Sequence, residues 1–143
     1  MRNDGSSSED EFVKRWQDAF GKDVFVKKLT DTKSIRKVSN GPFSQQAPAT
    51  PADFIVTVKG RMFFAEVKSC SNKTSFPFSQ FTKSQRAAMV QQHTAGGVYM
   101  VYIHNMNTKE WFEVSGPALL DLEKTKNQKS IKWNELAGTR WLI

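Results

Sequence analysis

The chain has 143 residues, a formal net charge of +7 at pH 7 and one cysteine, Cys70. This length predicts a single domain over residues 1–143, and a lone cysteine excludes both an internal disulfide and a cysteine-based zinc site. The positive charge favours an acidic partner, with nucleic acid the commonest and a membrane surface the alternative. No apolar run could span a bilayer and residues 2–8 lack a signal-peptide core, so we expect a soluble, cytoplasmic protein.

The N-terminal part of the chain predicts an amphipathic helix. Ser8 and Glu11 have the spacing of a capping box, so we expect the helix to start there, after flexible residues 1–7, and to end at Gly21. Its apolar positions recur at helical spacing and are Phe12, Val13, Trp16, Ala19 and Phe20.

A strand and a long polar segment follow this helix. Residues 24–29 are rich in valine and phenylalanine and predict the strand. Residues 31–50 are polar and carry Asn40-Gly41 at their centre. Because Asn-Gly favours a tight reversal, this segment is predicted to project as a hairpin or stalk, with a surface loop as the alternative.

Two β-prone runs, residues 50–58 and 61–68, surround the dipeptide Lys59-Gly60 and predict a hairpin. If the turn has two residues, counting back from it places Asp53 directly opposite Glu66. A slip of one residue would turn Glu66 to the other face of the sheet.

The second half of the chain continues the alternation of helices and strands. Thr82 and Gln85 form another capping box and predict a helix that stops at Gly96-Gly97. Apolar patterns predict the remaining elements, which are a strand buried on both faces at 98–103, a strand at 110–114, and a helix and tail over 115–143. This order is typical of an α/β protein.

The predicted hairpin brings chemistry-bearing side chains together. Glu66 and Lys68 are two residues apart on one strand, so they project on the same face, and Asp53 faces them from the other strand. Like charges facing each other are unfavourable unless a cation lies between them. The pair therefore suits a hard cation such as Mg²⁺ or Mn²⁺, although a surface hairpin with solvated charged ends remains the alternative.

The first helix offers a third carboxylate. Glu9 shares the face of Val13, Trp16 and Phe20, so we expect it to point toward the core and the site. Glu11 is predicted on the polar face, where it would serve only as a favourable charge near the helix N-terminus.

Residues 69–86 combine basic and hydroxyl side chains that suit phosphate contacts. The predicted DNA contacts there are Lys73, Thr74, Ser75, Lys83 and Arg86. The rings of Phe76, Phe78 and Phe81 could stack on bases, but packing in the core is favoured for them.

These residues resemble known nucleases. Pro51-Ala52-Asp53 followed by Glu66-Val67-Lys68 resembles the PD-(D/E)XK nuclease motif. Residues 72–78, with the sequence NKTSFPF, and Gln85 are similar to the RecU-type Holliday junction resolvases, and residues 5–14 resemble the opening of the archaeal Hjc resolvases. The resemblance runs from about Gly5 to Val114 and leaves the C-terminal tail uncovered.

The resemblance implies a restriction-endonuclease-like fold, with a central mixed β-sheet flanked by helices and a stalk-like segment that enters the junction. It implies a homodimer that cuts four-way DNA junctions by paired symmetric nicks, in a bacterial or archaeal host cell, and the short chain is compatible with a phage origin. The stalk would contact DNA through Lys33, Arg36, Lys37 and Phe43.

The resemblance also implies a catalytic site. Asp53, Glu66, the main-chain carbonyl of Val67 and Glu9 would bind Mg²⁺, with Mn²⁺ as a substitute and no small-molecule cofactor. The metal would activate water and stabilise charge on the phosphate. Lys68 would orient the water or help to deprotonate it, Gln85 would face the same cleft, and the products would carry 5′-phosphate and 3′-hydroxyl ends.

Two other functions remain open at this point. A repair or restriction-like endonuclease of the same fold would share the carboxylates and lysine but differ in residues 31–50 and in oligomeric state. A non-catalytic DNA-binding module would need only the basic surface, and metal-dependent cleavage would distinguish it from both enzymes.

Overall fold

The computed structural model describes residues 5–30 and 49–143. Its helices are α1 (Gly5–Phe20), α3 (Lys83–Thr94) and α4 (Gly116–Thr125), with short 3-10 helices at Gly21–Asp23, Phe78–Gln80 and Trp133–Thr139. Its strands are β1 (Val24–Lys28), β2 (Phe54–Val58), β3 (Arg61–Cys70), β4 (Ser75–Pro77), β5 (Tyr99–Asn105), β6 (Trp111–Ser115) and β7 (Ser130–Lys132). Among these residues, no helix has the length and apolarity needed to cross a membrane.

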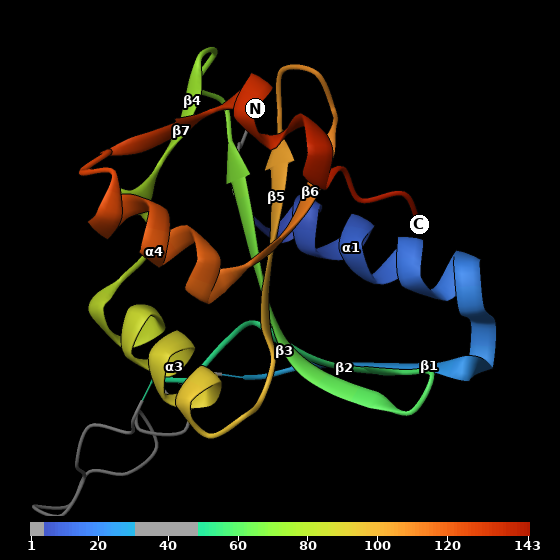
Figure 1. The fold of residues 1–143 in the computed structure, drawn as a ribbon. Coiled ribbons are helices and arrows are strands. Elements are labelled where there is room, and N and C mark those ends of the chain that lie inside the picture. Colours follow the sequence, from blue (N-terminus) through green and yellow to red (C-terminus); the bar gives the residue numbers. More distant parts are fainter. Residues whose placement is uncertain (1–4, 31–48) are drawn as a thin grey trace, which may run out of the picture.

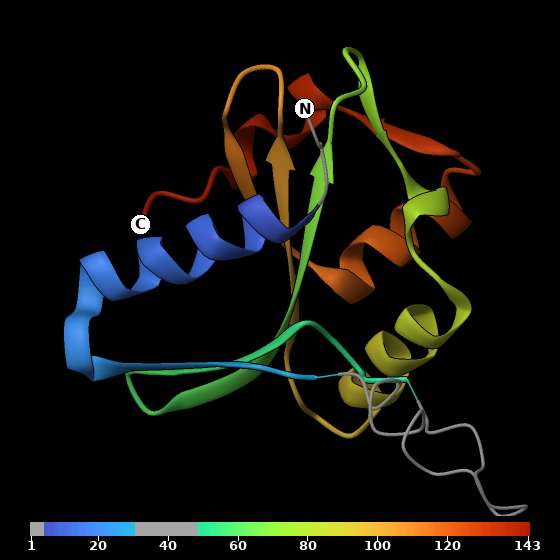
Figure 2. The same ribbon diagram turned by 180° about the vertical axis from the view of Figure 1, so that it is seen from behind.

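The centre of the fold is a five-stranded mixed sheet in the order β1-β2-β3-β5-β6. Strands β3 and β5 are parallel, whereas the other neighbours are antiparallel. Helix α1 covers one face of this sheet, and α3 and α4 cover the other (Figures 1 and 2). Strands β4 and β7 form a separate antiparallel pair. The predicted α/β fold, with a central mixed sheet flanked by helices, is confirmed.

The hairpin of β2 and β3 has the predicted register. Val58 pairs with Arg61 across the two-residue turn, and the ladder continues to Phe54 opposite Ala65. Lys59 and Gly60 have φ values of 53° and 76°, the left-handed backbone that a type I′ turn requires. This turn suits the right-handed twist of the strands, so it fixes the register despite the unusual lysine. One step beyond the ladder, Asp53 comes opposite Glu66.

The sheet separates two apolar clusters. On the α1 face, Phe12 and Trp16 pack with residues of the sheet and with Trp141. On the other face lie Phe76, Phe78 and Phe81, which are almost fully buried, together with Cys70. The prediction that the three rings pack in the core is confirmed. Strand β5 contributes to both clusters, as its continuous apolar sequence predicted.

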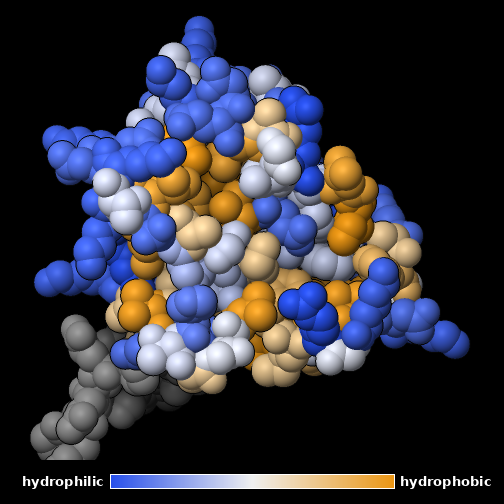
Figure 3. All heavy atoms as spheres, viewed as in Figure 1, coloured by the Kyte–Doolittle hydropathy of each residue, from blue (hydrophilic) through white to orange (hydrophobic). Residues whose placement is uncertain are grey.

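Part of the sheet keeps one open face. Phe25 and Met62 are 58% and 62% exposed, and both pair with Thr57, so they form one row across β1, β2 and β3. This row lies on the face opposite α1, because the alternate residues of β1 pack in the α1 cluster. The space-filling view shows further hydrophobic residues exposed among hydrophilic ones on the face of the molecule seen in Figure 1 (Figure 3).

The predicted start of the first helix is wrong. Helix α1 begins at Gly5, so Ser8 lies inside it and is no N-cap. The Ser8 hydroxyl is fully buried and lies 2.9 Å from Nδ1 of His104 on β5. Glu11 accepts a hydrogen bond from the Trp111 indole instead of closing a capping box. These contacts with β5 and β6 hold the first turns of α1 in place of a local cap, and residues 5–7, which were predicted to be flexible, are helical.

Candidate active site

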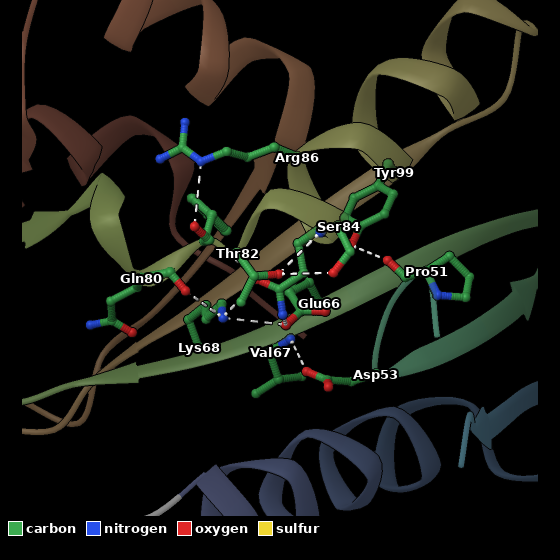
Figure 4. Close-up of polar contacts among 12 residues, drawn as sticks. Pro51, Asp53, Glu66, Val67, Lys68, Gln80, Thr82, Ser84, Arg86 and Tyr99 are labelled. Atoms are coloured by element: carbon green, nitrogen blue, oxygen red, sulfur yellow. Dashed lines mark hydrogen bonds and ion pairs between the residues drawn. The ribbon is translucent and has the colours of Figure 1, made fainter. Parts of the chain in front are cut away.

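Asp53, Glu66 and Lys68 meet between β2, β3 and the N-terminus of α3 (Figure 4). Glu66 lies in the middle of β3 and is 2% exposed. Asp53 directly precedes β2, and its Oδ2 accepts a hydrogen bond of 2.9 Å from the backbone N–H of Val67. Nζ of Lys68 lies 3.5 Å from Oε2 of Glu66. The three side chains predicted from the hairpin are therefore assembled at one place.

Gln85 joins this group from α3. Its Nε2 donates to Oε2 of Glu66 at 2.8 Å, and its Oε1 accepts from Nζ of Lys68 at 3.1 Å. The same Oε1 accepts from the backbone N–H of Thr82, which completes the predicted capping box. One side chain thus caps α3 and bridges the carboxylate and the lysine, so the helix start is coupled to the site.

Lys68 is held in a fixed orientation. Its ammonium group donates to the carbonyl oxygen of Gln80 at 2.9 Å, in addition to its contacts with Gln85 and Glu66. The side chain is 14% exposed. An ammonium group has three donors, and these partners fix where its charge points. Lys68 can therefore supply a localised positive charge at the rim of the carboxylate pair.

The two carboxyls are in an environment that disfavours a double negative charge. Burial raises the pKa of Glu66 to about 8, and the charge of Asp53 adds to this effect, while Lys68 opposes it. Burial likewise raises the pKa of Asp53, against the hydrogen bond from Val67. Since burial and mutual repulsion both penalise the ionised pair, a divalent cation between the oxygens would relieve the penalty. This observation fits a hard metal ion held by oxygen ligands.

Glu9 lies near this pair but is engaged elsewhere. Its carboxylate adds to the negative field that raises the pKa of Asp53, so α1 does present Glu9 toward the site. However, Oε1 of Glu9 is ion-paired with Nζ of Lys28 at 2.5 Å. Within residues 5–30 and 49–143, no three His, Cys, Asp or Glu side chains are grouped so that they could hold a metal. Lys28, which sequence reasoning missed, occupies the place beside the third carboxylate.

A second missed residue is Tyr99, at the start of β5. Its hydroxyl donates to the carbonyl oxygen of Pro51 at 2.6 Å, close to Asp53 in sequence (Figure 4). Burial raises the pKa of Tyr99, and the charges of Glu66 and Asp53 raise it further, so the hydroxyl stays protonated. No local motif marks a tyrosine at a strand start, and only the pairing of β3 with β5 brings it here.

Comparison with known proteins identifies the family. The model of the family RecU, recombination protein U, matches residues 20–143. This chain belongs to the RecU family. The match reaches the end of the chain, so the resemblance drawn from the motifs, which stopped at Val114, was too short. The structure agrees, because Trp141 is buried against α1 and Arg15 donates to the carbonyl oxygens of Trp141 and Ile143.

A solved structure shares the fold of this RecU-family chain. Hjc from Archaeoglobus fulgidus, a Holliday junction resolvase, matches with a TM-score of 0.51 and 14% sequence identity, over 93% of each chain. At this identity the likeness shows the fold alone. No curated protein sequence matches the chain.

The predicted DNA contacts of the RecU-family chain differ in how free their side chains are. Lys73 and Lys83 are exposed, and Lys83 is the first residue of α3. Thr74 is exposed, but its hydroxyl and N–H both bond to Oδ1 of Asn72. Ser75 is half-buried in β4.

Arg86 has a structural task. Its guanidinium is paired with Glu123 of α4 and donates to the carbonyl oxygen of Phe78 at 2.7 Å. It also donates to the carbonyl oxygen of Phe81 at 3.4 Å. A phosphate contact by Arg86 would therefore compete with these partners. The predicted stalk contacts Lys33, Arg36, Lys37 and Phe43 lie outside the described residues.

Proposed function

We propose that this RecU-family protein is a Holliday junction resolvase, an Mg²⁺-dependent endonuclease that cuts four-way DNA junctions by paired symmetric nicks. The observation that carries the proposal is the buried pair of Asp53 and Glu66, linked through Gln85 to Lys68, in a chain of the RecU family. The shared fold with Hjc, which is itself a Holliday junction resolvase, supports it. The net charge of +7 suits a polyanionic substrate.

In this proposal, Asp53, Glu66 and the carbonyl oxygen of Val67 would hold the metal, with Glu9 contributing directly or through water. When bound, the metal would lower the pKa of water and stabilise negative charge on the scissile phosphate. Lys68, fixed by Gln80 and Gln85, orients the attacking water and adds positive charge where the transition state becomes more negative. Gln85 fixes the Glu66 carboxylate and the Lys68 ammonium group relative to each other, because its amide donates to the first and accepts from the second.

Paired nicks require two active sites, and we propose a homodimer as their source. A closed two-fold dimer would present two identical sites to the two strands that must be cut. Sedimentation at micromolar concentration should give about twice the monomer mass. A monomer that still produced symmetric paired nicks would contradict this part of the proposal.

The direct test of the function compares a synthetic four-way junction with a linear duplex of the same sequence. We expect paired nicks in the junction with Mg²⁺, slower cleavage of the duplex, and no cleavage in EDTA. Equal cutting of both substrates would favour a repair or restriction-like endonuclease. Binding without cleavage of any DNA under all metal conditions would favour a non-catalytic DNA-binding module.

The two neighbouring glutamates of α1 should have different roles. We expect Glu9→Gln to lower the turnover of junction cleavage at least about tenfold, because the negative charge of Glu9 acts on Asp53. Glu11→Gln should leave turnover unchanged and cost about 1 kcal/mol of stability, because its carboxylate accepts the hydrogen bond of Trp111. Single-turnover kinetics and thermal unfolding measure the two effects. Equal kinetic losses in both variants would show that Glu9 has no special place at the site.

A further inference from the structure

The hydroxyl of Tyr99 reaches the segment that carries the predicted metal ligand Asp53. Tyr99 is 1% exposed, and its hydroxyl donates to the carbonyl oxygen of Pro51 at 2.6 Å (Figure 4). Pro51 has no N–H, so its carbonyl is the backbone group through which it can be held. Asp53 follows two residues later, directly before β2, and its carbonyl oxygen accepts a hydrogen bond of 2.8 Å from the N–H of Leu29, just beyond β1. The Tyr99 hydroxyl therefore holds Pro51, on the side of Asp53 that leads away from the sheet.

Packing leaves the Tyr99 ring little freedom. Gly116, the first residue of α4, lies against it, and a Cβ there would come 3.1 Å from Cδ1 of Tyr99 and 3.0 Å from Sδ of Met89. Phe64 of β3 pairs with Tyr99 in the parallel ladder, and its ring centroid lies 6.2 Å away. Glu66 is two residues further along the same strand. Tyr99 is therefore anchored to the strand that carries one carboxylate and bonded to the segment that carries the other.

We propose that Tyr99 is a positioning residue for the metal centre, whose hydroxyl holds the Pro51–Asp53 segment so that Asp53 meets Glu66 at a fixed separation. The inference rests on the proposed function, in which these carboxylates bind Mg²⁺. The Asp53 carboxylate itself accepts a hydrogen bond from the N–H of Val67 and lies within hydrogen-bond reach of Glu66, so its position depends on how the Pro51–Asp53 segment is held. Without the Tyr99 hydroxyl the ligands remain, but Asp53 loses part of its orientation.

Tyr102 supplies a matched control. It is also fully buried on β5, and its hydroxyl donates to Oε2 of Glu113 at 2.7 Å. Because side chains alternate along a strand, Tyr102 packs in the α1 cluster, whereas Tyr99 packs in the cluster on the other face. Tyr102→Phe and Tyr99→Phe each remove one buried hydroxyl that donates to an oxygen. Only Tyr99→Phe removes a hydrogen bond to the Pro51–Asp53 segment.

The test measures Mn²⁺ binding to the full chain without DNA, from the electron paramagnetic resonance signal of free Mn²⁺. We expect Tyr99→Phe to weaken Mn²⁺ binding by about tenfold, the effect typical of outer-shell partners of metal ligands, and Tyr102→Phe by less than about twofold. Both variants should lose similar thermal stability. Junction cleavage by Tyr99→Phe should be partly restored by raising the metal concentration, which a general folding defect would not produce.

Gly116→Ala tests the position of the Tyr99 ring instead of its hydroxyl, because the added Cβ must displace Tyr99 or Met89. It should weaken Mn²⁺ binding while keeping the hydroxyl. Wild-type affinity in both Tyr99→Phe and Gly116→Ala, or equal losses in Tyr99→Phe and Tyr102→Phe, would overturn the inference. A wild-type protein that binds no Mn²⁺ and cuts no junction would instead overturn the proposed function.

Discussion

Asp53→Asn and Glu66→Gln should each lower the cleavage of a four-way junction by at least about a hundredfold, because each replaces a carboxylate of the proposed metal site by a neutral amide and so removes a negative charge from the metal ligands. Junction binding should be unchanged or tighter, since each substitution removes negative charge beside a polyanion. Both substitutions keep the size and shape of the side chain. The measurements are single-turnover cleavage in Mg²⁺ and a binding titration in Ca²⁺.

Glu110→Gln is the matched control for charge. Glu110 forms an exposed ion pair with Arg140 at 2.9 Å, away from the carboxylate pair, so its loss should leave cleavage near the wild-type rate. Lys68→Met should lose turnover but retain Mn²⁺ binding, because it removes the ammonium group and none of the proposed metal ligands. Near-wild-type cleavage by either Asp53→Asn or Glu66→Gln, in folded protein, would rule out the proposed metal site.

Local rules were sufficient to predict the centre of the site. A two-residue turn at Lys59-Gly60 fixes the register of the hairpin, and the alternation of side chains then places Asp53, Glu66 and Lys68 together. Gln85 was predicted both as part of a capping box and as a residue of the cleft, and the structure gives it both contacts at once. Each of these inferences depends on neighbours close in sequence or on one hairpin.

The parts that sequence reasoning missed depend on contacts between distant segments. Ser8 has the pattern of an N-cap, but its hydroxyl bonds to His104, 96 residues away. Tyr99 reaches Pro51 only because β5 pairs in parallel with β3. Lys28 pairs with Glu9 because β1 packs against α1. No periodicity or motif encodes such pairs, since the register between parallel strands is set by the packing of both faces of the sheet.

Without divalent metal, the stability of the protein should fall as the pH rises from about 5 to about 8. The pKa of Glu66 is raised from its ordinary value near 4.5 to about 8 in the folded state. Between these values the folded chain binds more protons than the unfolded chain, so stability decreases with pH. The favourable contribution is complete below pH 4.5 and is lost as the pH passes through about 8. Because one pKa unit corresponds to about 1.4 kcal/mol, the expected loss is a few kcal/mol.

Mg²⁺ should reverse this loss, because in the proposed site it binds the ionised carboxyls of the folded state, and such binding stabilises that state by an amount that grows with the logarithm of the metal concentration. We expect the rise in melting temperature on adding Mg²⁺ to be large near pH 8 and small near pH 5.5, where protons compete for the same oxygens. Burial lowers the pKa of His104, which acts in the opposite direction at low pH, but His104 contributes equally with and without metal.

Two variants separate the contribution of Glu66 from that of other carboxyls. Glu66→Gln should abolish most of the dependence of stability on pH and most of the Mg²⁺ effect, whereas Glu110→Gln should preserve both. The measurement is thermal unfolding of the wild type and the two variants, in EDTA and in Mg²⁺, across this pH range. An Mg²⁺ effect of the same size at both ends of the range would mean that the metal does not bind at the buried carboxyl of Glu66.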